Sequence, residues 1–242
     1  MSLVPAFSPS VVFSPGTGPL VLTCEHASNR LPPWLAWPNE DRWLIGTHWA
    51  WDIGIAEVTL QLAERLAVTA ALAGFSRLVA DPNRDLDDPT LIRREAHGRE
   101  IALNRGLTDE DRAARVRLWQ AYHDAIDGVL GAQPGGVLLS MHSFTPHYQD
   151  DEPRGMEIGV LFDRDEAAAA ALAGALAREG LHVALNEPYS GKGGLMYCVE
   201  RHASPEGRVA LELEIRQDLA DDPFVRRRLV PAIEKAVRAS LG

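Results

Sequence analysis

A short apolar run that ends on an acid and a histidine is the first feature of the sequence with a chemical meaning. Residues 21–24 read VLTC, and Glu25 and His26 follow directly. Strands usually end on Gly, Asn, Asp or Pro, which turn the chain at little cost. A strand that ends on Glu and His instead indicates that the sheet delivers reactive side chains to one of its edges.

Similar polar side chains accompany other predicted strands. They are Asp81, Asn83 and Arg84 after 75–80, His142 and Ser143 after 136–141, the NEPYSGKGG segment after 181–185, and Glu212, Glu214 and Arg216 on the strand that begins at 208. In open α/β sheets, ligands gather at the carboxyl ends of the strands. We therefore expect these side chains to converge on one edge of the sheet.

Two of the strand-end histidines, His26 and His142, could share a metal ion. Two imidazoles and a carboxylate form the usual ligand set of a catalytic zinc site, which leaves a position for water. The alternative is a pair of hydrogen-bonded structural histidines, the commoner role for any single histidine. The residues alone leave the carboxylate open, because Asp52 could simply cap a helix. Glu25 and His48 are the other candidates.

Strict alternation over residues 208–215 places Glu212, Glu214 and Arg216 on one face of a strand, opposite Leu211 and Leu213. A solvent-facing edge strand would give the same pattern. If the polar face lines the site, one glutamate can serve as the general base that activates water. Glu214, which is nearest the carboxyl end, is the better placed.

Asn83 and Arg84 form an amide–guanidinium pair that could bind a substrate carboxylate, because arginine offers a bidentate fork. The alternative is a turn residue beside a surface salt bridge. The sequence contains no GxSxG motif, and neither Cys24 nor Cys198 has a convincing base partner, which disfavours serine and cysteine hydrolases. The NEPYSGKGG segment suits a lid but lacks the spacing of a nucleotide-binding loop.

Strand-like and helical segments alternate along the chain. The expected strands are 19–24, 75–80, 136–141, 157–162, 181–185 and 208–215, and the expected helices are 52–68, 108–130, 165–179 and 222–240. The third helix ends before Gly180. Thr108 with Asp111 resembles a capping box, and Pro231 indicates a kink or a new start. Trp119 and His123, four residues apart in the second helix, are interpreted as packing residues.

The alternation predicts an α/β fold with a mostly parallel or mixed central sheet and helices on both faces. We expect a single domain over residues 1–242, with the long, charged segment 81–107 as a functional loop.

Composition excludes several classes of protein. The 242 residues carry a net charge of −10, and the one dense basic cluster, Arg226 to Arg228, suits a solvated helix face. This disfavours nucleic acid as a partner. No apolar run approaches the roughly 18 residues that span a membrane. The N-terminal residues do not read as a signal peptide, and two cysteines do not form a disulfide framework. A cytoplasmic location is expected, and the oligomeric state is open.

Six motifs, in this order, resemble the N-formylglutamate amidohydrolase family over about residues 19–220: CEHASNRLP, HWAWDIG, SRLVADPNR, MHSFTP, NEPYSGKGG and LELEIRQDL. The family is similar in fold to zinc carboxypeptidases and aspartoacylase-like hydrolases, a phosphorylase/hydrolase-like α/β arrangement. The resemblance implies a metal-dependent amidohydrolase that acts on a small-molecule N-acyl amino acid. The substrate implied first is N-formyl-L-glutamate, which yields formate and glutamate in histidine breakdown.

The resemblance also implies roles for individual residues. His26, Asp52 and His142 would bind Zn²⁺, Glu214 would be the catalytic base, and Asn83 with Arg84 would bind the substrate, with Arg216 as a second cation. One position departs from the carboxypeptidase pattern, which has a glutamate three residues after the first histidine where this chain has Asn29. Two alternatives remain open: hydrolysis of another N-acyl amino acid or peptide, and a binding protein that captures acidic ligands without turnover.

Overall fold

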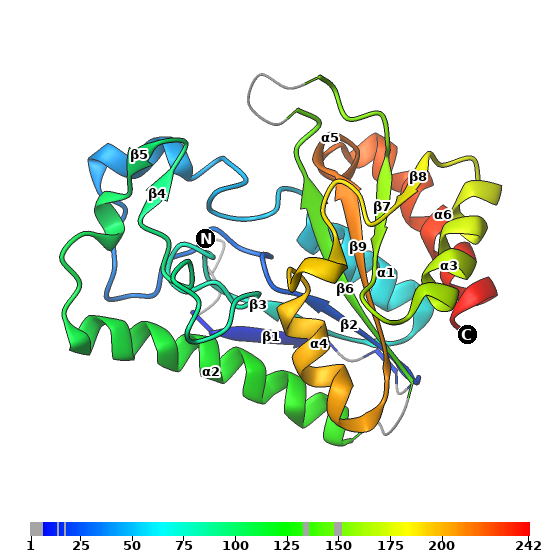
Figure 1. Ribbon diagram of the computed structural model, residues 1–242, viewed down its shortest axis with the longest axis horizontal. Helices are drawn as coiled ribbons and strands as arrows, with labels where there is room; N and C mark the ends of the chain where they lie inside the picture. The colour runs from blue at the N-terminus through cyan, green and yellow to red at the C-terminus, as the bar shows by residue number, and fades with distance from the viewer. Residues whose placement is uncertain (1–6, 14, 17, 133–135, 148–151) are drawn as a thin grey trace, which may run out of the picture.

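A seven-stranded sheet forms the centre of the protein, with the order β1-β3-β2-β6-β9-β7-β8 (Figure 1). The computed structural model describes residues 7–13, 15–16, 18–132, 136–147 and 152–242. The strands are β1 Ser10–Phe13, β2 Leu20–Cys24, β3 Thr69–Ala73, β6 Val137–Phe144, β7 Ile158–Leu161, β8 Val183–Leu185 and β9 Val209–Arg216. Strand β1 runs antiparallel to β3, and β7 to β9, whereas the other neighbours are parallel. The predicted mixed sheet is therefore confirmed.

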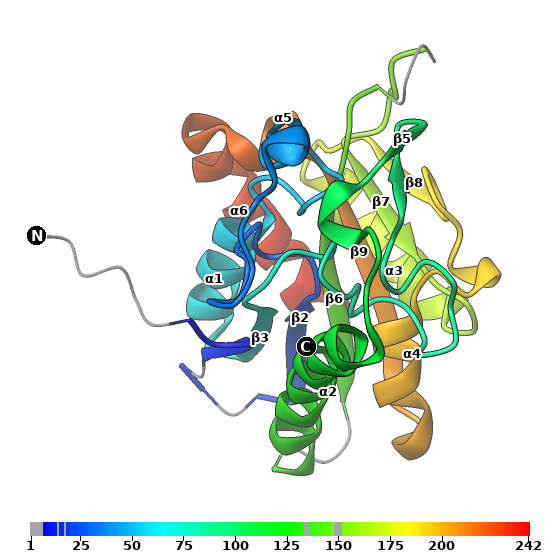
Figure 2. The same ribbon diagram turned by 90° about the vertical axis from the view of Figure 1, so that its left-hand side faces the viewer.

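Helices cover both faces of this sheet, as predicted. They are α1 Ile55–Leu66, α2 Asp109–Gly131, α3 Glu166–Arg178, α4 Tyr197–Ala203, α5 Gln217–Asp221 and α6 Pro223–Ser240. Helices α1, α3 and α6 pack on one face, and α2 and α4 pack on the other (Figure 2). No helix in the described part of the chain combines the length and the apolarity needed to cross a membrane.

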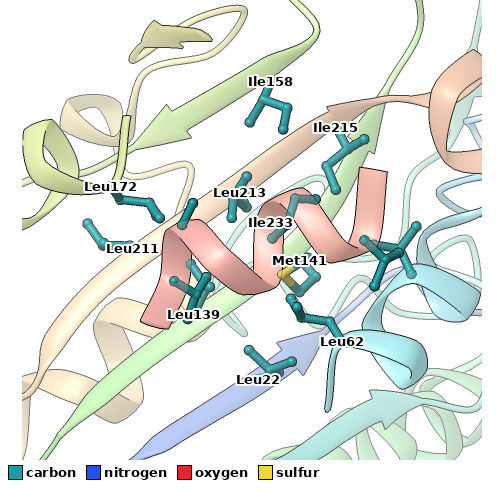
Figure 3. Close-up of a cluster of buried hydrophobic side chains, with 14 of the residues drawn as sticks. Leu22, Leu62, Leu139, Met141, Ile158, Leu172, Leu211, Leu213, Ile215 and Ile233 are labelled. Carbon is teal, nitrogen blue, oxygen red and sulfur yellow. The ribbon is translucent and has the colours of Figure 1, made fainter. Parts of the chain in front are cut away.

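The larger core lies between the sheet and helices α1, α3 and α6. Figure 3 shows Leu211, Leu213 and Ile215 of β9 among its side chains, close to Ile233 of α6. Each fully buried side chain of this size contributes about 1.5–3 kcal/mol to folding. Because neighbouring residues of a strand face opposite ways, this packing turns Glu212 and Glu214 to the face covered by α2 and α4.

The segment 75–80, predicted as a strand, is a series of turns, so that prediction is wrong. The strand of this region is β3, residues 69–73, whose alanine-rich sequence does not resemble a strand. All five of its residues are buried between β1 and β2, and this packing overrides their weak strand propensity. Segment 75–80 instead leads the chain out of the sheet toward the long loop.

Helix α1 begins at Ile55, not at Asp52. Its N-cap is Gly54, whose φ of 80° is left-handed, and no side chain caps the helix. A Cβ at Gly54 would lie 2.4 Å from the backbone of Ala220, so this position requires glycine. The interpretation of Asp52 as an N-cap is therefore wrong, and its carboxylate bonds elsewhere.

The predicted capping box of α2 is confirmed, since Thr108 Oγ1 accepts from the Asp111 amide and Asp111 accepts from the Thr108 amide. Helix α6 continues through Pro231 with no new start. The long segment 81–107 contains a short hairpin, β4 Glu95–Ala96 and β5 Arg99–Glu100, followed by the 3₁₀ helix Ala102–Asn104.

Candidate active site

Three side chains converge at the carboxyl ends of the neighbouring strands β2 and β6. His26 follows β2, His142 lies within β6, and Asp52 lies in the loop before α1, where its amide donates to the His26 carbonyl. His26 Nδ1 lies 3.1 Å from His142 Nδ1, and Asp52 Oδ2 lies 2.9 Å from His142 Nδ1 and 3.5 Å from His26 Nδ1. All three side chains are at most 5% exposed. Ligand atoms around one zinc ion are separated by about 3.3 Å.

The other nitrogen of each ring is held by a buried carboxylate. His26 Nε2 lies 2.7 Å from Asp81 Oδ1, and His142 Nε2 lies 2.8 Å from Glu25 Oε2. A carboxylate accepts, so each Nε2 carries the hydrogen of a neutral ring and each Nδ1 carries a lone pair. The two lone pairs and the Asp52 oxygen then face one another in a buried site. This arrangement requires a shared cation, either a proton or a metal ion.

The pKa values of this cluster reflect the concentration of negative charge. Although burial opposes it, Glu212, Asp52 and Glu25 hold the pKa of His142 well above its ordinary value. Burial alone would raise the pKa of Asp52, but the neighbouring His26 and His142 outweigh this effect and lower it. In the absence of a metal ion, the cluster therefore holds a proton at His142.

Glu25 does not belong to the converging group. Its carboxylate is fully buried and accepts from Ser140 Oγ at 2.5 Å, from Tyr122 OH at 3.2 Å and from His142 Nε2. His142, Ser140 and Cys198 lower the pKa of Glu25 against the opposing effect of burial. Glu25 thus orients His142 from behind. Asp81 has the same relation to His26 and also accepts from Arg77 Nη2 at 2.8 Å.

Glu212 and Glu214 extend the cluster from β9. Glu214 lies beside His142 in the β6–β9 register, and His142, Glu212 and Glu214 bring ligand atoms within 4.8 Å of one another. The Oε2 atom of each glutamate is buried without a hydrogen-bond partner among the described residues. Burial raises the pKa of Glu214 to about 8, with Glu212 and Asp52 adding to it. A pKa in this range is typical of groups that exchange protons during catalysis.

A cavity of about 500 Å³ opens onto this cluster. Four arginines and three aromatic residues line the cavity: Arg77, Arg84, Arg93 and Arg154, and Trp49, Phe144 and Tyr189. Glu214 also lines it. The cavity thus joins a metal-binding type of cluster to a cationic and aromatic wall.

Asn83 and Arg84 both line this cavity. Asn83 Nδ2 donates to the Leu195 carbonyl at 3.0 Å, and the Cys198 amide donates to Asn83 Oδ1 at 3.0 Å. Asn83 therefore ties two loops together through its amide oxygen and one of its two amide hydrogens. Arg84 Nη1 donates to the Asn83 carbonyl at 2.8 Å.

Arg216 and His48 differ from the sequence-based expectation in their placement. Arg216 Nε donates to Asp218 Oδ1 at 2.8 Å, and Arg216 is not among the described residues that line the cavity. His48 does line it, but none of the clusters that could hold a metal among the described residues includes His48. Burial and the charge of Arg77 lower the pKa of His48 to about 4, and its Nε2 is buried without a partner in the described structure.

Sequence reasoning missed Arg154, which follows the end of β6. Its guanidinium lies 5.5 Å from the ring centre of Phe144 and 5.4 Å from that of Tyr189. Arg154 Nη1 donates to the Thr145 carbonyl at 3.1 Å. The segment DEPRG around Arg154 carries no motif or periodicity, so nothing local in the sequence indicated this role. Arg77 was missed because it lies in the segment that was predicted to be a strand.

An α/β sheet whose carboxyl edge carries a His–Asp–His cluster and a buried glutamate beside a cavity suits enzymes of more than one class. Comparison with protein families identifies which one: residues 18–220 match the N-formylglutamate amidohydrolase family. The chain belongs to this family, and the resemblance drawn from the six motifs is confirmed.

Solved structures agree with this assignment. A gene product of Agrobacterium tumefaciens is 29% identical, with a TM-score of 0.85 over 96% of this chain and 94% of that one. N-formylglutamate amidohydrolase from Ralstonia eutropha is 21% identical, with a TM-score of 0.70 over 96% of this chain and 98% of that one, and so shares the fold. A comparison with curated proteins gives no match.

Proposed function

We propose that the protein hydrolyses the amide bond of an N-acyl amino acid, with N-formyl-L-glutamate as the first candidate, and that His26, Asp52 and His142 bind Zn²⁺. The observation that carries the proposal is the convergence of two Nδ1 lone pairs and a carboxylate oxygen beside Glu214. Membership of an amidohydrolase family supports the class of reaction.

The residues present fit a zinc ion. Two imidazoles and a carboxylate are a catalytic zinc ligand set, and carboxylates orient both rings. When bound there, zinc supplies a Lewis acid for the amide carbonyl and lowers the pKa of a water molecule.

Glu214 is the proposed proton carrier. Its Oε2 atom has no hydrogen-bond partner in the described structure, and it lies at the cavity. In its ionised form it accepts a proton from the attacking water, and it then donates this proton to the departing nitrogen of the amino acid. A pKa that is raised by burial lets one carboxyl group act first as base and then as acid.

The cationic wall supports an acidic substrate. Asp81 forms an ion pair with Arg77. The pKa of Arg93 is lowered by burial and by the positive charges of Arg77 and Arg84, which shows that cationic side chains lie close together around Arg93. N-formylglutamate carries two carboxylates that would offset this charge. The local positive charge would attract an anionic substrate although the whole chain has a net charge of −10.

We assign the α-carboxylate of the substrate to Arg84 and the second amide N–H of Asn83, and the side-chain carboxylate to Arg154. Sequence reasoning gave the role of the second cation to Arg216, and Arg154 takes it in this proposal because Arg154 lines the cavity whereas Arg216 pairs with Asp218. Two arginines at different points of the cavity would distinguish a dicarboxylate from a monocarboxylate.

The proposal includes a cytoplasmic location and a part in histidine breakdown. The two cysteines are unpaired and buried, which supports a reducing compartment. A small molecule is the proposed partner.

The test is formate release from N-formyl-L-glutamate by the purified protein, with and without a strong chelator. Release that the chelator abolishes and zinc restores supports the reaction and the metal together. His142→Ala should lose the zinc ion of this site and the activity while the circular dichroism spectrum is retained. Zinc retained at full stoichiometry by that variant contradicts the ligand assignment.

Two other outcomes would change the proposed substrate or the proposed activity. Turnover of other N-acyl amino acids or peptides without formate release would keep the site and change the substrate. Binding of N-formylglutamate by a folded, zinc-loaded sample without any turnover would favour a binding protein on this fold.

A further inference from the structure

A second group of metal-ligating side chains lies between helices α2 and α4. His123 comes from α2, and Cys198 and His202 lie one turn apart on α4. All three are buried, and they bring ligand atoms within 4.8 Å of one another. We propose that His123, Cys198 and His202 bind a transition-metal ion of the zinc class at a site separate from the catalytic cluster.

A ladder of hydrogen bonds fixes the protons of the two histidines. His202 Nδ1 lies 2.8 Å from Asp127 Oδ1, and His202 Nε2 lies 2.7 Å from His123 Nδ1. The Asp127 carboxylate accepts, so His202 carries its hydrogen on Nδ1 and a lone pair on Nε2. His123 must then donate from Nδ1, which leaves a lone pair on His123 Nε2.

His123 is fully buried, and its Nε2 forms no hydrogen bond with another side chain in the described structure, whereas the Pro82 carbonyl faces the ring and raises its pKa against the effect of burial. An unpaired buried acceptor is unfavourable and rare in folded proteins. A metal ion bound among these side chains would use such an imidazole lone pair, as histidine ligands do in zinc sites.

The donor types suit a zinc-class ion. Burial and the neighbouring His202 lower the pKa of His123 to about 3. Burial also lowers the pKa of His202. Both rings are therefore neutral, as metal-binding imidazoles must be. Asp127 holds His202 as an outer carboxylate holds a metal-bound histidine. This repeats the relation of Asp81 to His26 in the catalytic cluster.

Cys198 must release a proton for the metal to bind. Burial and the Glu25 carboxylate, to which the thiol donates, raise the pKa of Cys198. On binding, the S–H bond breaks, the sulfur–metal bond forms, and the proton leaves to solvent. The hydrogen bond from His123 Nδ1 to His202 Nε2 also breaks, so that the lone pair of His202 Nε2 can bind the metal ion. Affinity should therefore rise with pH. Ligand atoms around zinc are separated by about 3.3–3.7 Å, so small side-chain rotations assemble the site.

The proposed site adjoins the active-site cavity through α4. The Cys198 amide donates to Asn83 Oδ1, and Asn83 Nδ2 donates to the Leu195 carbonyl at the cavity wall. A metal ion that links α4 to α2 would therefore brace the loop that carries Leu195.

Cobalt(II) substitution tests the proposal, because a thiolate ligand gives a near-ultraviolet charge-transfer band that nitrogen and oxygen ligands do not. The catalytic cluster contains no sulfur, so the band reports on the second site alone. We expect wild-type protein to bind two equivalents of cobalt and to show the band. Cys198→Ala should lose the band and one equivalent. Cys24→Ala is the matched control, since Cys24 is also buried and unpaired but lies outside the cluster.

His142→Ala separates this inference from the proposed function. That variant should lose the catalytic equivalent of cobalt and keep the charge-transfer band. Circular dichroism and a thermal melt check the fold of every variant. Absence of the band from cobalt-saturated wild-type protein overturns the proposal without any variant, and a band that survives in Cys198→Ala overturns it equally.

Discussion

The Nδ1 atoms of His26 and His142 lie 3.1 Å apart. In the neutral form of each ring the hydrogen is on Nε2, so no hydrogen bond joins the two Nδ1 atoms. Asp81 and Glu25 occupy the opposite nitrogens and thereby direct both lone pairs to the same point. Neither carboxylate touches that point. The outer pair of acids therefore orients the inner pair of histidines and in this way supports their affinity for a metal ion.

The first prediction concerns Asp81. Asp81→Asn removes the negative charge behind His26 and weakens its orientation, so zinc affinity should fall by about 10- to 100-fold. Competition with a chromophoric chelator measures this affinity. Asp85→Asn is the control, because Asp85 is exposed and its carboxylate accepts from the neighbouring Leu86 amide and not from a histidine. Equal zinc affinity of Asp81→Asn and wild type would show that the outer carboxylate does not matter.

The second prediction concerns Glu214. Glu214→Gln keeps the shape of the side chain but cannot accept a proton, so kcat should fall by about 10²- to 10⁴-fold. Zinc content should stay unchanged, because the proposed ligands remain. The measurements are formate release and metal analysis of the same sample. Glu110→Gln, on the exposed first turn of α2, should behave as wild type. Unaltered turnover by Glu214→Gln would remove it from the mechanism.

Much of the sheet could be predicted from local sequence. Strand β2, at Leu20–Cys24, lies within the predicted segment 19–24, because a continuous apolar run is typical of a strand buried on both faces. The proximity of His26 and His142, 116 residues apart, followed from one rule about the carboxyl ends of parallel strands. The general geometry of parallel sheets was therefore enough to predict that the two histidines lie close together.

Other parts depend on contacts that local sequence does not encode. Strand β3 consists of residues 69–73, TAALA, and only its place between β1 and β2 makes it a strand. Asp52 resembles an N-cap, but Gly54 takes that position because the chain passes close to Ala220 there. Arg154 meets Tyr189, 35 residues further along the chain, only in the folded protein.

The third prediction concerns Arg154. Arg154→Ala should lower kcat/KM for N-formylglutamate by about 10- to 100-fold, since a charge-assisted hydrogen bond contributes about 1.5–3 kcal/mol. The loss should be much smaller for N-formylglutamine, which lacks the side-chain carboxylate. Arg216→Ala is the control, because Arg216 pairs with Asp218. A larger loss in Arg216→Ala than in Arg154→Ala would return the role to Arg216.

The fourth prediction concerns the pH dependence of stability through His48. Burial and Arg77 lower the pKa of His48 to about 4 from an ordinary value of 6.5. Between these two values the unfolded chain binds a proton that the folded protein does not bind, so stability falls as the pH falls through this window. His48→Gln removes this contribution.

Urea unfolding of metal-free protein at pH 7.5 and pH 5 (about one pH unit above and about one and a half below the unfolded pKa) measures the effect. Relative to wild type, His48→Gln should gain about 1 kcal/mol of unfolding free energy at the lower pH, a figure that allows for the partial exposure of the ring. Thr47→Ser, a conservative change at the adjacent residue, should follow wild type at both values. If the wild-type and His48→Gln profiles run parallel, His48 takes up its proton as readily in the folded protein as in the unfolded chain.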